Sequence, residues 1–294
     1  MNKVGFIGVG IMGKSMVRNL MKAGFELHIY ARTKSKVEDV ISEGAQFHES
    51  IKDCVQDCDA VITIVGFPQD VEEVYFDEGN ILDSAKKGAY LIDMTTTSPQ
   101  IAEKIYEEGT KRGFHVMDAP VTGGDTGAKS GTLSILVGGE KEDYEACMPL
   151  FEAKGTNINN QGKAGCGQHC KLANQIMIAG TLSGVCEALT YVKEQGLDPE
   201  VFMKSVATGA AGSKQLDTFG PKILKDDYAP GFFMKHFIKD MKLALIEANR
   251  KGLSLDVLSM VLANYEELEQ EGYGDLGTQA LMKFYDEEHR NTEE

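Results

Sequence analysis

Three glycines near the start of the chain, Gly8, Gly10 and Gly13, constrain most strongly what it can fold into. They have the spacing G-x-G-x-x-G, follow an apolar run at residues 4–8 and open a stretch, residues 12–23, with helical periodicity. In this setting they allow a tight turn, a close approach of the backbone to a pyrophosphate, and close packing of helix on strand. The pattern predicts a dinucleotide-binding unit, and a merely glycine-rich turn is the alternative.

The rest of the first half alternates strand-like and helix-like stretches. Further strands are expected at residues 27–30, 60–65, 90–93, 115–117 and 132–137. Helices are expected at residues 34–43 and 99–112, and from the last strand through residue 147. This alternation predicts a parallel, doubly wound sheet of the Rossmann type.

The second half is expected to be helical. Apolar residues recur at helical spacing over residues 171–194, 200–207, 236–250, 255–269 and 278–287. Three glycines between residues 162 and 167 break the preceding pattern. The prediction is an α/β domain over residues 1–163 and an all-helical domain over residues 164–294, joined by a long helix.

The formal net charge of −15 argues against nucleic acid as a partner, because phosphate neutralisation needs clustered Lys and Arg. No membrane span is expected, since stretches such as residues 60–65 and 176–185 are too short or too interrupted. The N-terminal sequence shows no signal-peptide pattern, so the expected location is the cytoplasm.

The six cysteines are expected to be free thiols. Cys166, His169 and Cys170 have a spacing that would place three metal ligands on one helical face. A closed zinc site needs a fourth ligand, and no second Cys/His pair supplies one. No metal is therefore expected.

The segment after the second expected strand indicates which cofactor binds. An NAD site places a carboxylate there for the ribose 2′-hydroxyl, whereas this chain has Arg32 and Thr33 and no acid before Glu38. A guanidinium can bind a 2′-phosphate through two hydrogen bonds. The sequence thus favours NADP, with NAD as the alternative, unless Arg32 merely begins a solvated helix.

Two further segments carry groups suited to chemistry. Thr122, Gly123 and Gly124 form an expected loop after a strand, where a hydroxyl and backbone amides would cradle a carboxylate; a plain turn is the alternative. Lys171 opens a long helix with Gln175 one turn later. Burial and the helix dipole would lower the pKa of a lysine there and suit it to acid/base chemistry, although a surface lysine is the commoner case.

Together these motifs resemble the β-hydroxyacid dehydrogenase family. The resemblance rests on the glycine fingerprint, the loop at residues 118–124, the element Gly165-x-Gly167…Lys171-x-x-Asn174, and Lys239-Asp240, and it covers essentially the whole chain. The family includes 3-hydroxyisobutyrate dehydrogenases, tartronate semialdehyde reductases and glyoxylate/succinic semialdehyde reductases, and is related to 6-phosphogluconate dehydrogenase.

The resemblance implies a role for each matched residue. Lys171 would be the catalytic acid/base, residues 122–124 would hold the substrate carboxylate, and Asn174 and Gln175 would contact the substrate. The implied or expected cofactor contacts are Gly8, Gly10, Ile11, Met12, Gly13, Arg32, Thr33, Val65, Gly66, Thr95 and Lys239.

Three positions depart from the common family pattern. Gln175 stands where many members have Asn, as in tartronate semialdehyde reductases, and Thr122 stands where many have Ser. Ala31 replaces a frequent Asn. The first two leave the substrate open, and the third touches only the adenosine end of the cofactor.

The sequence therefore predicts an NADP-preferring oxidoreductase that moves a hydride between nicotinamide and C3 of a small 3-hydroxy acid or the matching semialdehyde. The alternatives are an imine reductase on the same scaffold and a non-catalytic NADP-binding sensor or scaffold. The presence of Lys171 counts against both. Long apolar faces in the second half favour a homo-oligomer.

Overall fold

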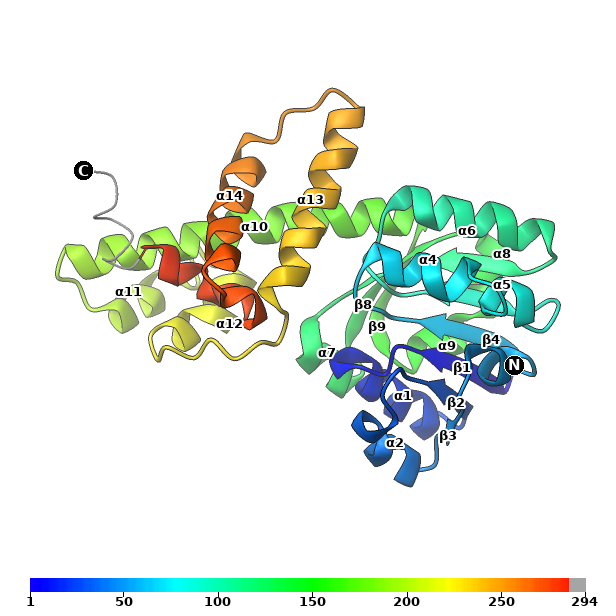
Figure 1. Cartoon of the computed structure of the whole chain (residues 1–294). Helices are drawn as coiled ribbons and strands as arrows, with labels where there is room; N and C mark the ends of the chain where they lie inside the picture. Colours follow the sequence, from blue (N-terminus) through cyan, green and yellow to red (C-terminus); the bar gives the residue numbers. More distant parts are fainter. Residues whose placement is uncertain (286–294) are drawn as a thin grey trace. The chain divides into compact units, whose positions relative to one another are not determined.

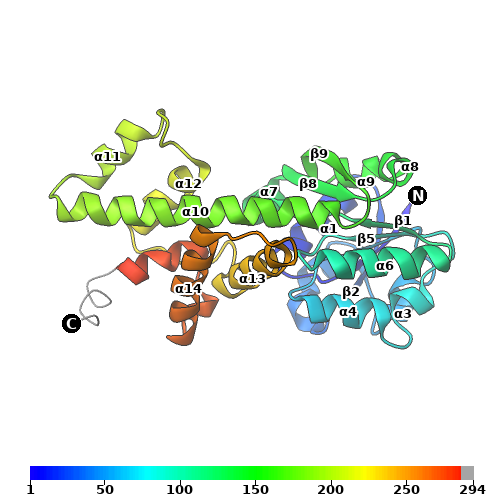
Figure 2. The same ribbon diagram turned by 90° about the horizontal axis from the view of Figure 1, so that it is seen from above.

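The computed structural model describes residues 1–285, which form two compact units that divide between Lys171 and Leu172 (Figure 1). The division falls inside helix α10 (Cys166–Glu194), which Figure 2 shows as one continuous helix. The first unit therefore includes the first turns of α10, and the second unit includes the remainder. The domain boundary predicted between residues 163 and 164 precedes this helix and stays a prediction.

The first unit is built on a nine-stranded sheet whose parallel part has the order β3-β2-β1-β4-β5-β6. These parallel strands are β1 (Lys3–Ile7), β2 (Glu26–Tyr30), β3 (Gln46–Phe47), β4 (Ala60–Thr63), β5 (Tyr90–Asp93) and β6 (His115–Asp118). All four residues of β4 are buried, as expected for a strand covered on both faces. This strand order is that of a doubly wound domain, so the predicted fold class is confirmed.

The other strands are β7 (Val121–Thr122), β8 (Leu133–Gly138) and β9 (Gly155–Gly162). Strand β8 runs antiparallel to β6 and β7, and β9 pairs with β8 in parallel. Strand β9 was not predicted, because its sequence GTNINNQG shows no apolar alternation and most of its residues are exposed. Its backbone pairing with β8 forms the strand without a buried face.

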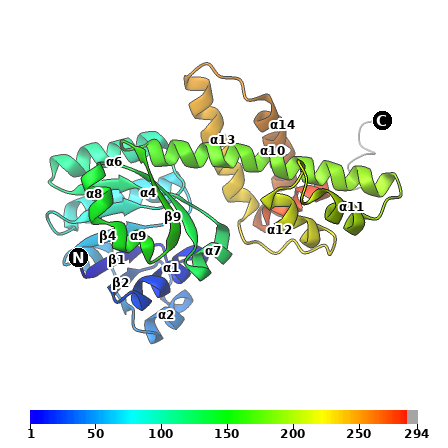
Figure 3. The ribbon, with the colours of Figure 1, turned by 180° about the vertical axis from the view of Figure 1, so that it is seen from behind.

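Helices cover both faces of the sheet (Figure 3). Apolar side chains pack on one face from α1 (Ile11–Lys22), α7 (Gly124–Ser130) and α9 (Met148–Glu152). Those on the other face come from α3 (Ile51–Val55), α4 (Pro68–Phe76), α5 (Ile81–Ser84) and α6 (Pro99–Lys111). Helix α8 (Lys141–Ala146) is a short helix between β8 and α9.

One predicted helix, over residues 34–43, is interrupted in the structure. It consists of the 3-10 turn η1 (Lys34–Lys36) and the short helix α2 (Glu38–Ser42). Val37 between them leaves helical geometry, with φ −124° and ψ 10°, and is fully buried in the core. Burying the Val37 side chain in the core is favoured over the one regular helix through residues 34–43 that the periodicity predicted.

The second unit is helical, as predicted. With the rest of α10 it contains α11 (Pro199–Val206), α12 (Lys214–Ile223), α13 (Met234–Arg250), α14 (Asp256–Gln270), η2 (Tyr273–Asp275) and η3 (Thr278–Tyr285). Its core includes Leu182, Phe237, Met241 and Tyr265. Helix α12 was not predicted. The helix expected over residues 278–287 is a 3-10 helix as far as Tyr285, and residues 286 and 287 lie outside the described residues.

Among the described helices, α10 alone is long and apolar enough by length and composition to cross a membrane. This differs from the sequence expectation, which considered residues 176–185 of this helix but not its full length. The core helix of a soluble protein passes the same test, and in this helix 44% of the apolar window is buried inside the protein.

Lys154, between α9 and β9, is a fully buried lysine in the first unit. Its Nζ donates to the carbonyl oxygen of Leu150 at 2.6 Å. Burial lowers the pKa of Lys154 from 10.5 to about 7, because the charged form loses its hydration. Packing and one hydrogen bond therefore hold the side chain in place, and the contribution of Lys154 to the free energy of unfolding depends on pH.

We expect Lys154→Met to flatten part of the pH dependence of stability. Between pH 7 and about 10.5 the unfolded chain binds a proton at Lys154 that the folded protein releases, so stability rises with pH in this window. The slope is at most about 1.4 kcal/mol per pH unit. Urea unfolding at pH 7 and pH 9 should show the wild type gaining stability relative to the variant. An unchanged difference between the two proteins would contradict the pKa shift.

Candidate functional site

The glycine turn lies between β1 and α1 and has the geometry that the fingerprint predicts. Gly8 has φ +94°, and a side chain there would collide with the carbonyl of Ile64. A side chain at Gly13 would collide with the carbonyl of Gly8, so strand and helix pack closely at this position. A Cβ at Gly10 would meet no protein atom within 4 Å. The open space at Gly10 is where a ligand can approach the backbone.

Helix α1 presents its N-terminus beside this turn. Gly10 is its N-cap, no side chain caps its first amides, and its first turn contains no acidic residue. Its amides and the positive end of the helix dipole are thus available to an anion. These features fit the pyrophosphate of a dinucleotide, with Ile11 and Met12 in the first turn supplying backbone amides.

The carboxyl ends of β4 and β5 are tied together by hydrogen bonds. The Val65 amide donates to Thr95 Oγ1 at 3.0 Å, and the Thr95 amide donates to Asp93 Oδ1 at 3.1 Å. Thr63 Oγ1 also donates to Asp93 Oδ1, at 2.8 Å. The structure thus brings together Val65 and Thr95, two expected cofactor contacts, with Gly66 next in the chain. Asp93 holds this arrangement, and sequence reasoning did not identify it.

Arg32, which follows β2, is paired with acids that the sequence did not place near it. Its guanidinium contacts Asp70 Oδ1 and lies 3.5 Å from Glu73 Oε2, both on α4. The sequence predicted no acid close to Arg32, and this prediction is wrong, because the two carboxylates come from 38 and more residues away. The Arg32 side chain is still 62% exposed, so part of the guanidinium remains accessible to a ligand.

Asp118, at the end of β6, anchors the start of α10. Its Oδ1 accepts a hydrogen bond from the Gly165 amide at 2.7 Å, and its Oδ2 accepts one from the Gln168 amide at 2.8 Å. The side chain is almost fully buried. Burial raises the pKa of Asp118 to about 7, although both amide hydrogen bonds oppose the shift. The carboxylate satisfies two backbone donors at a helix start that would otherwise lack partners.

Gln168 connects the same helix start to the loop after β5. Its Nε2 donates to the carbonyl of Thr95 at 2.8 Å, and its Oε1 accepts from the Thr97 amide at 3.0 Å. The side chain is fully buried. Sequence reasoning missed Gln168, because no local pattern marks a glutamine whose partners are more than 70 residues earlier in the chain.

Thr122 lies in a strand rather than in the loop that the sequence predicted. It ends β7 and pairs with Ser134 of β8 in antiparallel register. Gly123 and Gly124 follow with φ +129° and +65°, values that favour glycine. The chain turns sharply at this point into α7. The pairing of β7 fixes the backbone of Thr122, while its side chain remains partly exposed.

Lys171 is in the second turn of α10 and is the last residue of the first unit. It is only 7% exposed, which rules out the alternative of an ordinary surface lysine. Asp118 and Gln168 both hold the helix within six residues of it. Its predicted acid/base role stays a prediction.

In the second unit the expected substrate and cofactor residues form one group, joined through Asp240 by two hydrogen bonds and one ion pair. Gln175 Nε2 donates to Asp240 Oδ2 at 2.6 Å, and Asn174 Nδ2 donates to Gln175 Oε1 at 2.8 Å. Lys239 Nζ lies 3.0 Å from Asp240 Oδ1. Helices α10 and α13 position these four residues. Gln175 and Asp240 are buried, and Asn174 is partly exposed.

All six cysteines are free thiols in the described chain. Cys166, His169 and Cys170 share the start of α10, yet no group of three or more potential metal ligands comes together within residues 1–285. The free thiols agree with the sequence expectation.

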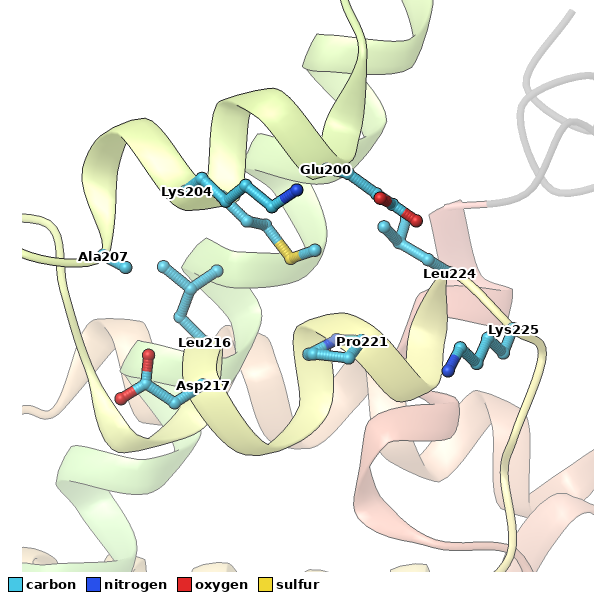
Figure 4. Close-up of a pocket in the computed structure, with 9 residues that line it drawn as sticks. Glu200, Lys204, Ala207, Leu216, Asp217, Pro221, Leu224 and Lys225 are labelled. Atoms are coloured by element: carbon cyan, nitrogen blue, oxygen red, sulfur yellow. The ribbon is translucent and has the colours of Figure 1, made fainter.

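A groove of about 390 Å³ lies between α11 and α12 in the second unit (Figure 4). Lys204, Leu216 and Pro221 are among its lining residues. None of the residues expected to hold cofactor or substrate lines this groove, so we do not assign it to the candidate active site.

The comparisons with known proteins agree with this geometry. A family model described as the NAD binding domain of 6-phosphogluconate dehydrogenase matches residues 3–162. A second, described as NAD-binding of NADP-dependent 3-hydroxyisobutyrate dehydrogenase, matches residues 165–285. Fold and models together define an NAD(P)-binding oxidoreductase.

Similar proteins cover nearly the whole chain. An uncharacterized oxidoreductase of Bacillus subtilis, YkwC, is 48% identical over 96% of this chain and 98% of its own. The 2-hydroxy-3-oxopropionate reductase of Escherichia coli is 37% identical over 86% of each chain. A solved 3-hydroxyisobutyrate dehydrogenase of Mycobacterium tuberculosis with L-serine has a TM-score of 0.88 and 25% identity, covering 97% and 99% of the two chains. This chain belongs to the 3-hydroxyisobutyrate dehydrogenase-like, or β-hydroxyacid dehydrogenase, family.

We expect Asp118→Asn to destabilise the protein by about 1–3 kcal/mol, because a buried backbone donor loses its acceptor. At pH 8 the Asp118 carboxylate is ionised and accepts from two amides, whereas an asparagine would direct its own NH₂ group at one of them. Urea unfolding at pH 8 measures the change.

Asp198→Asn is the matched control. Asp198 caps α11 at the surface, accepting from the amides of Glu200 and Val201. Asn caps an exposed helix as well as Asp does, so we expect almost no change. Equal effects of the two substitutions would show that Asp118 holds the start of α10 no more firmly than a surface cap.

Proposed function

We propose that this protein transfers a hydride between the nicotinamide of NADP and C3 of a small 3-hydroxy acid or the matching semialdehyde, with Lys171 as the acid/base. The observation that carries the proposal is the position of Lys171, a buried lysine in the second turn of α10. Asp118 anchors that helix from the end of β6, and β6 leads directly into the segment of Thr122.

Different residues would bind the cofactor, bind the substrate and transfer the proton. The turn at Gly8–Gly13, with the start of α1, would hold the pyrophosphate, and Val65 and Thr95 at the strand ends would position the cofactor further along. Thr122 and the backbone of the following glycines would bind the substrate carboxylate. Lys171 would donate a proton to the carbonyl oxygen during reduction and accept it back during oxidation. When bound, NADP supplies or accepts the hydride.

The names of the relatives support this substrate class. They include a reductase of 2-hydroxy-3-oxopropionate and a 3-hydroxyisobutyrate dehydrogenase solved with L-serine. Each of these compounds is a short acid with an oxygen on C3, so the proposed site needs only a carboxylate cradle and an acid/base near C3.

We expect Lys171→Ala to reduce turnover by about 10²–10⁴-fold, the usual contribution of a general acid/base. NADPH affinity should stay unchanged, because the expected pyrophosphate contacts lie in the glycine turn. Lys171→Arg should fail almost as completely, since a guanidinium does not release its proton near neutral pH. Steady-state rates and fluorescence titration with NADPH separate the two functions.

Lys163→Ala serves as the control for removing a lysine near the start of α10. Lys163 is exposed and lies before the helix. We expect this variant to keep wild-type turnover. A Lys171→Ala protein that keeps more than about a tenth of wild-type turnover would contradict the acid/base assignment.

A preference for NADP over NAD is supported by Arg32, which offers an accessible guanidinium just beyond β2. The carboxylates of Asp70 and Glu73 compete with a 2′-phosphate for this group. A phosphate carries more charge than either carboxylate and can bind the guanidinium through two oxygens. The two carboxylates should therefore reduce the preference for NADP over NAD without reversing it.

We expect Arg32→Ala to weaken NADPH binding by roughly tenfold and leave NADH binding unchanged, since a charge-assisted hydrogen bond contributes about 1.5–3 kcal/mol. Glu73→Gln is the matched variant: it removes one competing charge and should tighten NADPH binding slightly. Fluorescence titration of both cofactors with each protein tests this. Wild-type protein that binds NADH as tightly as NADPH would disprove the NADP preference.

A homo-oligomer is also part of the proposal. The outer face of α10 exposes Met177, Gly184 and Tyr191, and α14 exposes Val257 and Met260. Apolar residues gathered on adjoining helices are typical of surfaces that another chain covers.

A further inference from the structure

Four polar residues of the second unit form a continuous chain of interactions, which we name the amide relay. It runs from Lys239 to Asp240, from Asp240 to Gln175, and from Gln175 to Asn174. Asp240 is fully buried and Gln175 is 1% exposed, whereas Asn174 at the end is partly exposed. The buried part of the relay therefore ends at one accessible amide.

The chemistry of Asp240 fixes the direction of every hydrogen bond in the relay. A carboxylate paired with the Lys239 ammonium can only accept, so Gln175 must direct its NH₂ group toward Asp240. The oxygen of the Gln175 amide then lies at the other side, where it can only accept from the NH₂ group of Asn174.

The orientation leaves Asn174 Oδ1 as the atom not used by the relay. No hydrogen-bond partner for this oxygen occurs within residues 1–285, so both of its lone pairs can accept, while one of the two N–H groups of Nδ2 is already used by Gln175. Toward a ligand, Asn174 therefore acts first as an acceptor.

We propose that the amide relay makes Asn174 a hydrogen-bond acceptor for the substrate and so selects 3-hydroxy acids that carry a donor, a hydroxyl or an amino group, on C2. The inference rests on the proposed function, because it assumes a 3-hydroxy acid or its semialdehyde beside Asn174. In the semialdehyde, the carboxylate and the C3 carbonyl can only accept hydrogen bonds. The C2 substituent is the one group of the semialdehyde that can donate to Asn174. In the 3-hydroxy acid the C3 hydroxyl can donate as well, and the proposed function assigns that hydroxyl to Lys171, which leaves the C2 substituent for Asn174.

Gln175 is a positioning residue in this scheme, which revises the sequence-based expectation that it contacts substrate. Both ends of its amide are used inside the protein, by Asp240 and Asn174. Its length matters, because an asparagine is one methylene shorter and could not hold both partners at these distances. The common family residue at this position would therefore leave Asn174 free to present either end of its amide.

The experiment compares 3-hydroxy acids that differ only at C2, in the oxidation direction with the preferred cofactor. Glycerate and serine carry a donor on C2, 3-hydroxyisobutyrate carries a methyl group, and 3-hydroxypropionate carries hydrogen. Both enantiomers of each chiral acid are assayed. We expect kcat/KM for glycerate or serine to exceed that for 3-hydroxyisobutyrate at least tenfold, since sites that hydrogen-bond a substrate group reject analogues without it. Equal or better use of 3-hydroxyisobutyrate would overturn the proposal.

Two variants test whether the relay causes the preference. Gln175→Asn keeps an amide but breaks the relay, so the ratio of kcat/KM should fall toward one. In Asp240→Asn, the oxygen would remain with Lys239 and the new NH₂ group would face Gln175. The side-chain amides of Gln175 and Asn174 should then both rotate by 180°. Asn174 would present its NH₂ group as a donor, and the preference for a donor on C2 should disappear. A selectivity ratio that stays at the wild-type value in folded Gln175→Asn protein would overturn the relay mechanism.

The outcomes separate this inference from the proposed function. Wild-type protein that oxidises none of the acids contradicts both. Protein that oxidises them with Lys171-dependent turnover but without a C2 preference contradicts the relay alone. Circular dichroism and NADPH titration accompany each variant, and a loss of structure in Asp240→Asn leaves the Gln175→Asn ratio to decide.

Discussion

The carboxylate of Asp118 is the interaction on which the candidate site depends. It ends a parallel strand and accepts hydrogen bonds from two amides at the start of α10. The packing around it is close: a side chain at Gly167 would collide with the carbonyl of Leu136, and one at Gly138 would approach Asp118 itself. Strands β6 and β8 and the start of α10 meet at this point, so the position of Lys171 is fixed by a contact between backbone and one buried acid.

A buried aspartate also ends the neighbouring strand β5. Asp93 ends β5 and, through Thr63 and the amide of Thr95, ties together the segments that follow β4 and β5. Buried acids of this kind lose hydration, and each hydrogen bond that they accept recovers part of that cost. Each strand-end acid therefore orders the loop beyond it. In an open parallel sheet these loops are where ligands bind, so order among them prepares the site.

Local patterns predicted most of the fold, whereas contacts between distant segments escaped them. The fingerprint at Gly8–Gly13 predicts a turn largely from local geometry, namely the positive φ of Gly8 and the contact of Gly13 with Gly8. The alternation of strand and helix predicts the doubly wound sheet. Strand β9 lacks a buried face and so leaves no periodic trace. The pairs Asp70–Arg32 and Gln168–Thr95 were also missed. A polar pair between distant segments does not restrict the identity of the residues next to either partner in the sequence, so it leaves no local pattern.

Because α10 is a single unbroken helix, the number of residues between two of its side chains determines the angle between them. Each residue advances the helix by about 100° and 1.5 Å. Lys171 and Asn174 are three residues apart, which places them on nearly the same side. Substitutions in the interval change chemistry while keeping this alignment. Deleting one residue would leave the two only two positions apart, on opposite sides of the helix, whereas inserting one would leave them four apart and still on the same side. The interval between Lys171 and Asn174 therefore tolerates lengthening by one residue but not shortening.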